Sequence, residues 1–126
     1  MSGVVYDAGA LVAAERNDRR VWADHRVRLE AGVVPVVPAP VIAQVSRSPR
    51  QVQLRRLLGG CDVLALDEST AHAVGRLLGR SGTTDIVDAT VVTMAIASQA
   101  QVVTSDRDDI STLANAVGAR LVIIEA

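Results

Sequence analysis

Lysine is absent from this chain of 126 residues, and all 13 of its basic residues are arginine. This absence argues against Gly-Lys-Ser/Thr phosphate loops and against phosphotransfer folds that place a lysine beside the phosphate. Phenylalanine is also absent, and Trp22 and Tyr6 are the only aromatic residues. The chain therefore lacks the aromatic platform on which single-stranded bases stack, so we expect any contact with nucleic acid to use phosphates.

Cysteine and long apolar runs are scarce as well. The single Cys61 cannot form a disulfide within the chain, which favours a reducing, cytoplasmic compartment. No apolar run approaches the roughly 20 residues that span a bilayer, and residues 1–10 do not have the pattern of a signal peptide. Hydrophobic residues make up 49% of the chain, so we expect one globular domain over residues 1–126, without a membrane segment.

Five short apolar segments alternate with helical patterns. Strands are expected at 3–6, 33–37, 62–66, 101–105 and 120–125. Helices are expected at 8–16, 18–32, 38–47, 49–60 and 69–82, from Asp85 onward, and at 107–118. This alternation is typical of an α/β fold in which helices cover both faces of a parallel sheet.

Two of the expected strands end in an aspartate. The segment "VVYD" ends at Asp7, and "VVTSD" ends at Asp106. Ligands of parallel sheets bind beyond the carboxyl ends of the strands, and neighbouring strands lie about 4.8 Å apart. If these two strands are neighbours, Asp7 and Asp106 converge on one site, although Ser105 or Asp106 is also a candidate cap for the next helix.

Two further aspartates open a helix that is apolar almost all the way round, "TTDIVDATVVTMAIA" (83–97). An ionised carboxylate without a partner inside a protein costs several kcal/mol, on the order of 3 to 5 when a buried pair is broken. Helix phase points Asp88 toward the same interior as Val91 and Ala95, which favours a functional role. Asp85 has two interpretations, either as the N-cap of the helix or as a further carboxylate of a site.

A cluster of aspartates predicts a hard divalent cation. Carboxylates that lie within a few ångströms repel one another, which raises their pKa values unless a cation lies between them. Mg²⁺ and Mn²⁺ prefer oxygen ligands, lower the pKa of a bound water and neutralise charge on a phosphoryl oxygen. The residues alone therefore indicate metal-dependent hydrolysis of a phosphodiester.

Other catalytic chemistries of α/β folds lack their residues here. The first turn, "DAGALVA" (7–13), is not a dinucleotide-binding G-x-G-x-x-G, and no G-x-S-x-G is present. His25 and His72 lie in the middle of expected helices among polar neighbours, so we expect both on the surface. Asp108 and Asp109 have two interpretations, either as further acids of the cluster or as charges that only oppose a helix dipole.

Three segments resemble the PIN domain, and more narrowly the compact VapC-type toxins of bacterial toxin–antitoxin pairs. They are "VVYDAGALVA" (4–13), "VPAPVIAQVSR" (37–47) and "DATVVTMAIASQAQVVTSD" (88–106). The resemblance covers the whole chain and implies a five-stranded parallel sheet in the order 3-2-1-4-5. It also implies Mg²⁺- or Mn²⁺-dependent cleavage of RNA, a homodimer, and a small VapB-like antitoxin that blocks the site.

The resemblance also assigns roles to particular positions. The acids that the family carries after strands one and four, and at the start of the helix before strand four, fall on Asp7, Asp106 and Asp88. Thr104 is their hydroxyl neighbour, and a fourth acid of the family falls on position 44. These residues imply in-line attack on RNA by a metal-bound water, giving a 3′-hydroxyl and a 5′-phosphate.

Position 44 departs from the family pattern, because Gln44 stands where a glutamate is usual. An amide offers an oxygen but brings no charge and cannot act as a base. Asp85, one helical turn before Asp88, is the candidate to replace the missing charge at the metal. Two alternatives remain open: a catalytically decayed domain that binds RNA or protein, and a phosphatase that uses the same acids.

Overall fold

The strands of the protein are short and run parallel to one another. The computed structural model describes residues 3–126. The strands are β1 (Val4–Tyr6), β2 (Val36–Pro38), β3 (Asp62–Leu64), β4 (Gln101–Thr104) and β5 (Ile123–Glu125). Their order in the sheet is β3-β2-β1-β4-β5 and every pairing is parallel, which confirms the expected order. The strands that precede Asp7 and Asp106 are therefore neighbours.

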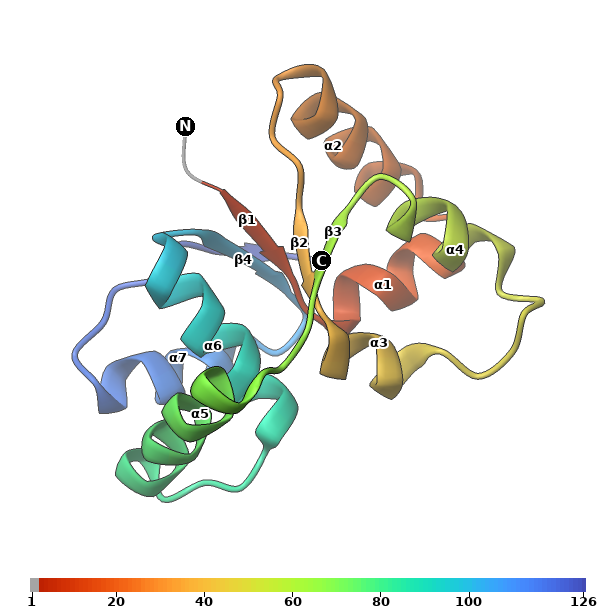
Figure 1. Cartoon of the computed structure of the whole chain (residues 1–126). Helices are drawn as coiled ribbons and strands as arrows, with labels where there is room; N and C mark the ends of the chain where they lie inside the picture. Colours follow the sequence, from red (N-terminus) through yellow and green to blue (C-terminus); the bar gives the residue numbers. More distant parts are fainter. Residues whose placement is uncertain (1–2) are drawn as a thin grey trace.

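Helices cover both faces of the sheet (Figure 1). They are α1 (Ala8–Glu15), α2 (Arg19–Glu30), α3 (Ala39–Val45), α4 (Val52–Leu58), α5 (Glu68–Ser81), α6 (Ile86–Ser98) and α7 (Arg107–Ala116). In Figure 1, α1, α2 and α4 lie on one side of the sheet, and α5, α6 and α7 lie on the other. Among residues 3–126, no helix has both the length and the apolar character needed to cross a membrane.

Every expected strand and helix is present, but several of them are shorter than predicted. Strand β2 begins at Val36 rather than at residue 33, and it includes Pro38, which was expected to open a helix. The backbone of Pro38 is extended, with φ −63° and ψ 136°, and it caps α3 from outside the helix. Proline supplies no backbone N–H, so it fits where the strand ends and the helix has not yet begun.

The core lies where α1 and α6 pack on opposite faces of the central strands. Val5 of β1 and Val102 of β4 are fully buried, as are Leu11 of α1 and Val91 of α6. Helix α6 also buries Ala89, Thr90, Val92 and Ala95. The expectation of a buried helix is confirmed, and its small side chains let the backbone of α6 lie close to the sheet.

The expected surface position of His25 is wrong, whereas His72 is exposed as predicted. His25 is 3% exposed, and its Nδ1 lies 2.9 Å from the hydroxyl of Tyr6. The helical spacing explains this position, because Val21 and His25 are four residues apart and both face inward. The sequence neighbours of His25 are polar, so the buried face of α2, formed by Val21 and His25, was not recognised from the sequence. The Tyr6 hydroxyl is the partner of its Nδ1, and no fully buried side-chain nitrogen or oxygen of residues 3–126 lacks a hydrogen-bond partner.

Candidate metal centre

Asp7 is fixed at the end of β1 by hydrogen bonds to both carboxylate oxygens. Oδ1 accepts from the backbone N–H of Ala8 at 2.8 Å, which caps α1, and Oδ2 accepts from the hydroxyl of Thr104 at 2.6 Å. The backbone N–H of Asp7 donates to the carbonyl of Val103 at 2.9 Å. Asp7 is 1% exposed, and its side chain is held by Ala8 at the start of α1 and by Thr104 at the end of β4.

Thr104 joins the ends of these two strands. The register pairs Tyr6 with Val103, which places Asp7 opposite Thr104. The hydroxyl that donates to Asp7 also accepts from the backbone N–H of Asp106 at 2.9 Å. Asp106 occupies the N-cap position of α7 without a capping bond from its side chain, so its exposed carboxylate is left for the site.

A glycine lets α1 approach the turn that carries Asp106. A β-carbon placed on Gly9 would lie 2.8 Å from the backbone nitrogen of Ser105, closer than real β-carbons approach other atoms. Only glycine therefore fits at this position without moving the turn. The sequence-based reasoning missed this role of Gly9, because a glycine near the start of a helix gives no signal of a contact so distant in the chain.

Asp88 reaches the same space from the other face of the sheet. It lies in the first turn of α6 and is 6% exposed, as the helix phase predicted. Its backbone N–H donates to Oδ1 of Asp85 at 3.0 Å, so the interpretation of Asp85 as an N-cap is confirmed. The N-cap fixes the first turn, and with it the direction of the Asp88 side chain.

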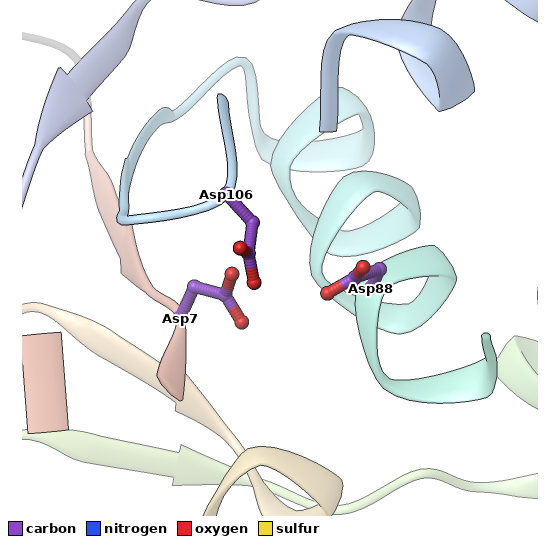
Figure 2. Close-up of side chains that lie close together, drawn as sticks. All are labelled: Asp7, Asp88 and Asp106. Atoms are coloured by element: carbon purple, nitrogen blue, oxygen red, sulfur yellow. The ribbon is translucent and has the colours of Figure 1, made fainter. Parts of the chain in front are cut away.

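Together these elements bring three carboxylates to one point (Figure 2). Asp7, Asp88 and Asp106 each offer an oxygen atom, and these atoms all lie within 4.8 Å of one another. Figure 2 shows the three side chains directed toward a common space, from the end of β1, from α6 and from the segment after β4.

The carboxylates raise one another's pKa. Burial is the main reason that the pKa of Asp88 rises to about 7, followed by the charges of Asp7, Asp85, Asp106 and Asp109. Burial also raises the pKa of Asp7, while the hydrogen bonds from Thr104 and Ala8 oppose that rise. Repulsion of this kind is expected where a cation normally balances the charge.

The donor set fits a hard divalent cation. All of its ligand atoms are carboxylate oxygens, and His25 is turned away into a separate hydrogen bond with Tyr6. Oxygen ligands select Mg²⁺ or Mn²⁺ over the softer metals that histidine and cysteine bind. Because a Mg²⁺ site retains several waters, three carboxylates from the protein are enough to hold the ion.

Asp85, which was expected at the metal, and Gln44, which was expected to assist catalysis, lie outside this group of three. Asp85 is exposed, and one of its carboxylate oxygens caps α6. Its contribution to the site is a negative charge that raises the pKa of Asp88. Gln44 is exposed in the last turn of α3, and within residues 3–126 its side chain has no hydrogen bond to the three aspartates. Asp109, which the sequence left either as a further acid of the cluster or as a charge that opposes a helix dipole, lies outside the group of three, and its charge raises the pKa of Asp88.

Comparison with solved structures shows proteins of the same fold. VapBC2 from Rickettsia felis, bound to a DNA fragment from its promoter, superposes with a TM-score of 0.73 at 15% identity, over 98% of each chain. PAE2754 from Pyrobaculum aerophilum superposes with a TM-score of 0.66 at 19% sequence identity, and the alignment covers 98% of this chain and 83% of the other. FitAB bound to the IR36 DNA fragment superposes with a TM-score of 0.59 at 12% sequence identity, and the alignment covers 97% of this chain and 94% of the other.

The amino-acid sequence matches the model of one protein family but no individual curated protein. The model of the PIN domain matches residues 4–116, a span that contains all three aspartates of the cluster, strands β1 to β4 and helices α1 to α7. Most of the chain is covered by this match, and the strand order agrees with it. The chain therefore belongs to the PIN domain family.

Proposed function

We propose that this protein is a Mg²⁺- or Mn²⁺-dependent endoribonuclease, acting as one domain over residues 1–126 and as the toxin of a VapBC-type toxin–antitoxin module. The observation that carries the proposal is the convergence of Asp7, Asp88 and Asp106 within 4.8 Å. PIN domains are in general nucleases, which supports the assignment of that cluster to phosphodiester hydrolysis.

The residues of the cluster have distinct duties in the proposed reaction. Asp7, Asp88 and Asp106 would hold the cation, which when bound lowers the pKa of water and neutralises charge on a phosphoryl oxygen. Thr104 keeps the Asp7 carboxylate in place by donating to Oδ2. In-line attack by water breaks the bond between phosphorus and O3′, which leaves a 3′-hydroxyl and a 5′-phosphate.

Two further residues are proposed to help at the edge of the site. Asp85 adds negative charge beside Asp88, which strengthens attraction for a cation. Gln44 offers an amide oxygen from α3, a helix that packs against α6. Both would orient water or a second cation, and neither needs to contact the first ion directly.

The proposed partners are an RNA substrate, a VapB-like antitoxin and a second copy of the chain. The substrate is a tRNA, an rRNA or an mRNA. The fold is shared with VapBC2 and FitAB, whose structures contain a DNA fragment bound by the complex, and this likeness supports an antitoxin partner. A cytoplasmic location suits the lone Cys61, since thiols stay reduced there.

A nuclease assay tests the proposal. The purified protein is incubated with structured RNA and Mn²⁺, alone or with EDTA, beside the variants Asp88→Asn and Asp108→Asn. Asp108 is an exposed acid of α7 outside the cluster, so it controls for loss of an acidic charge. We expect cleavage that EDTA and Asp88→Asn abolish and that Asp108→Asn retains. Equal cleavage by all variants would indicate a contaminating nuclease and contradict the proposal.

One observation favours a second function, that of a catalytically decayed PIN domain that binds RNA or protein. Gln44 stands where the family pattern has a glutamate and brings no charge to the site. The variant Gln44→Glu separates the two functions. An active parent enzyme supports the nuclease, whereas a parent without cleavage that gains it through Gln44→Glu supports decay of the site.

A further inference from the structure

Three clefts open beside the cluster of aspartates, and each contains at least one of its acids. The first is lined by the α5–α6 loop with Asp88 and by Asp109 of α7. The second contains Asp106, Arg107 and Glu125. The third runs from Asp106 along α1 to Arg16. A bound RNA strand must leave the site through surfaces of this kind, so their charges decide its path.

The clefts differ in whether they contain an arginine side chain that is free to bind a phosphate. No arginine lines the first cleft, whose charged groups are acids. In the second, Arg107 is already engaged, because its Nε lies 2.8 Å from Oε1 of Glu125 and it also donates to the carbonyl of Ile123 at 3.1 Å. In the third, the exposed guanidinium of Arg16 has no hydrogen bond or ion pair with any part of residues 3–126.

The wall of the third cleft is also open to an extended chain. Its α1 side consists of small or short side chains, namely Ala8, Gly9, Val12 and Ala13. One acid, Asp18, lines the cleft near Arg16, but its Oδ1 accepts from the backbone N–H groups of Arg20 and Val21 at the start of α2. The positive end of a helix offsets part of that negative charge.

We propose that Arg16 binds a backbone phosphate of single-stranded RNA next to the scissile one, so that the strand follows the cleft along α1. This inference rests on the proposed nuclease function. The helix rise places Arg16 about 12 Å beyond Ala8, too far along α1 to share the phosphate at the cluster. Arginine suits the contact because its planar guanidinium donates two parallel hydrogen bonds to a phosphate.

RNA binding as a function of salt tests this proposal. Fluorescence anisotropy of a labelled single-stranded RNA is measured in Ca²⁺ over a range of KCl concentrations, for the parent and for Arg16→Gln, Arg16→Lys and Arg76→Gln. Arg76 is an exposed arginine of α5 and lines a groove that contains none of the three aspartates, so it is a matched control. Thermal melting of each variant verifies that it is folded.

For Arg16→Gln we expect affinity to fall several-fold at low salt, and the slope of log K against log [KCl] to become shallower by about 0.7, the value for one phosphate on a single strand. Arg16→Lys retains the slope, and Arg76→Gln matches the parent. The same loss is expected with a DNA strand of identical sequence, because the contact is to phosphate. A loss confined to RNA, or an Arg16→Gln slope equal to that of the parent, overturns the proposal.

The test also separates this inference from the proposed function. A parent that cleaves RNA in Mn²⁺ while Arg16→Gln leaves binding unchanged overturns the role of Arg16 alone. A parent that binds RNA through Arg16 yet never cleaves it overturns the nuclease and leaves the binding path in place.

Discussion

The hydroxyl of Thr104 lies 2.6 Å from Oδ2 of Asp7 and 2.9 Å from the backbone nitrogen of Asp106. It donates to the first and accepts from the second, so one side chain holds the carboxylate of Asp7 and the backbone that carries Asp106. The contact with Asp7 depends on the parallel register that sets Asp7 opposite Thr104, whereas the contact with Asp106 is local to the turn after β4.

Replacement of Thr104 by valine removes that hydroxyl without changing the size of the side chain. We expect Mn²⁺ affinity to fall by roughly 10- to 100-fold, the usual cost of removing a group that orients a metal ligand. The matched control is Thr93→Val, because Thr93 lies on α6 away from the three aspartates. Isothermal titration calorimetry measures both variants, and equal affinities would show that Thr104 does not orient the site.

The pKa of Asp88 predicts how the metal-free protein responds to pH. Burial raises this pKa from 3.8 to about 7, so the folded state holds the proton more tightly than the unfolded state does. The contribution of this carboxyl to stability is therefore complete below about pH 4 and is lost as pH rises through 7.

Urea denaturation of the parent and of Asp88→Asn in EDTA, at several pH values, measures this effect. We expect the free energy of unfolding of the parent to fall between pH 4 and 7 relative to that of the variant. Saturating Mn²⁺ should restore the parent and leave Asp88→Asn unchanged. If the two proteins follow the same pH dependence in EDTA, then Asp88 does not carry the raised pKa.

Gly9→Ala tests the close approach of α1 to the turn after β4. The added β-carbon meets the backbone of Ser105 at 2.8 Å, so we expect a loss of about 1 to 3 kcal/mol in stability, as for other overpacked positions. Mn²⁺ affinity should fall as well, since the turn carries Asp106.

Gly75→Ala provides the matched control. Gly75 lies in the interior of α5, and a β-carbon there would meet nothing within 4 Å. We expect a gain of roughly 0.5 to 1 kcal/mol from the higher helix propensity of alanine. Thermal or urea denaturation measures both changes, and a Gly9→Ala variant as stable as the parent would refute the steric argument.

Asp85→Asn separates the two duties of Asp85, because asparagine retains the N-cap and removes the charge. If the charge compensates for Gln44, Mn²⁺ affinity and cleavage should both fall while the melting temperature stays within a few degrees. If Asp85→Asn has unchanged Mn²⁺ affinity and cleavage while Asp88→Asn is inactive, then the only role of Asp85 is to cap α6.

That the strands before Asp7 and Asp106 are neighbours was implied by the resemblance to the PIN domain. The periodic and strand-terminal signals alone were enough to predict a parallel sheet, its helices and the edge at which both acids lie. They were enough because the carboxyl ends of parallel strands share one edge, and because the phase of α6 fixes where Asp88 points. His25 was misplaced because its neighbours in sequence are polar, whereas its burial depends on Tyr6 from another element. The role of Gly9 depends on a contact with the distant Ser105, and the proposed role of Arg16 depends on the cleft that the fold forms between α1 and Asp106; a single sequence encodes neither locally.

The sheet order has a consequence for how the protein folds and unfolds. Asp7 follows β1 and Asp106 follows β4, while Asp88 comes from the helix between β3 and β4, so no local stretch of chain can assemble the three carboxylates. A cation bound there would link segments across the centre of the sheet, and any opening that separates β1 from β4 would have to release it. Because such a cation would bind the folded state alone, the free energy of unfolding should rise with the free concentration of Mg²⁺ or Mn²⁺.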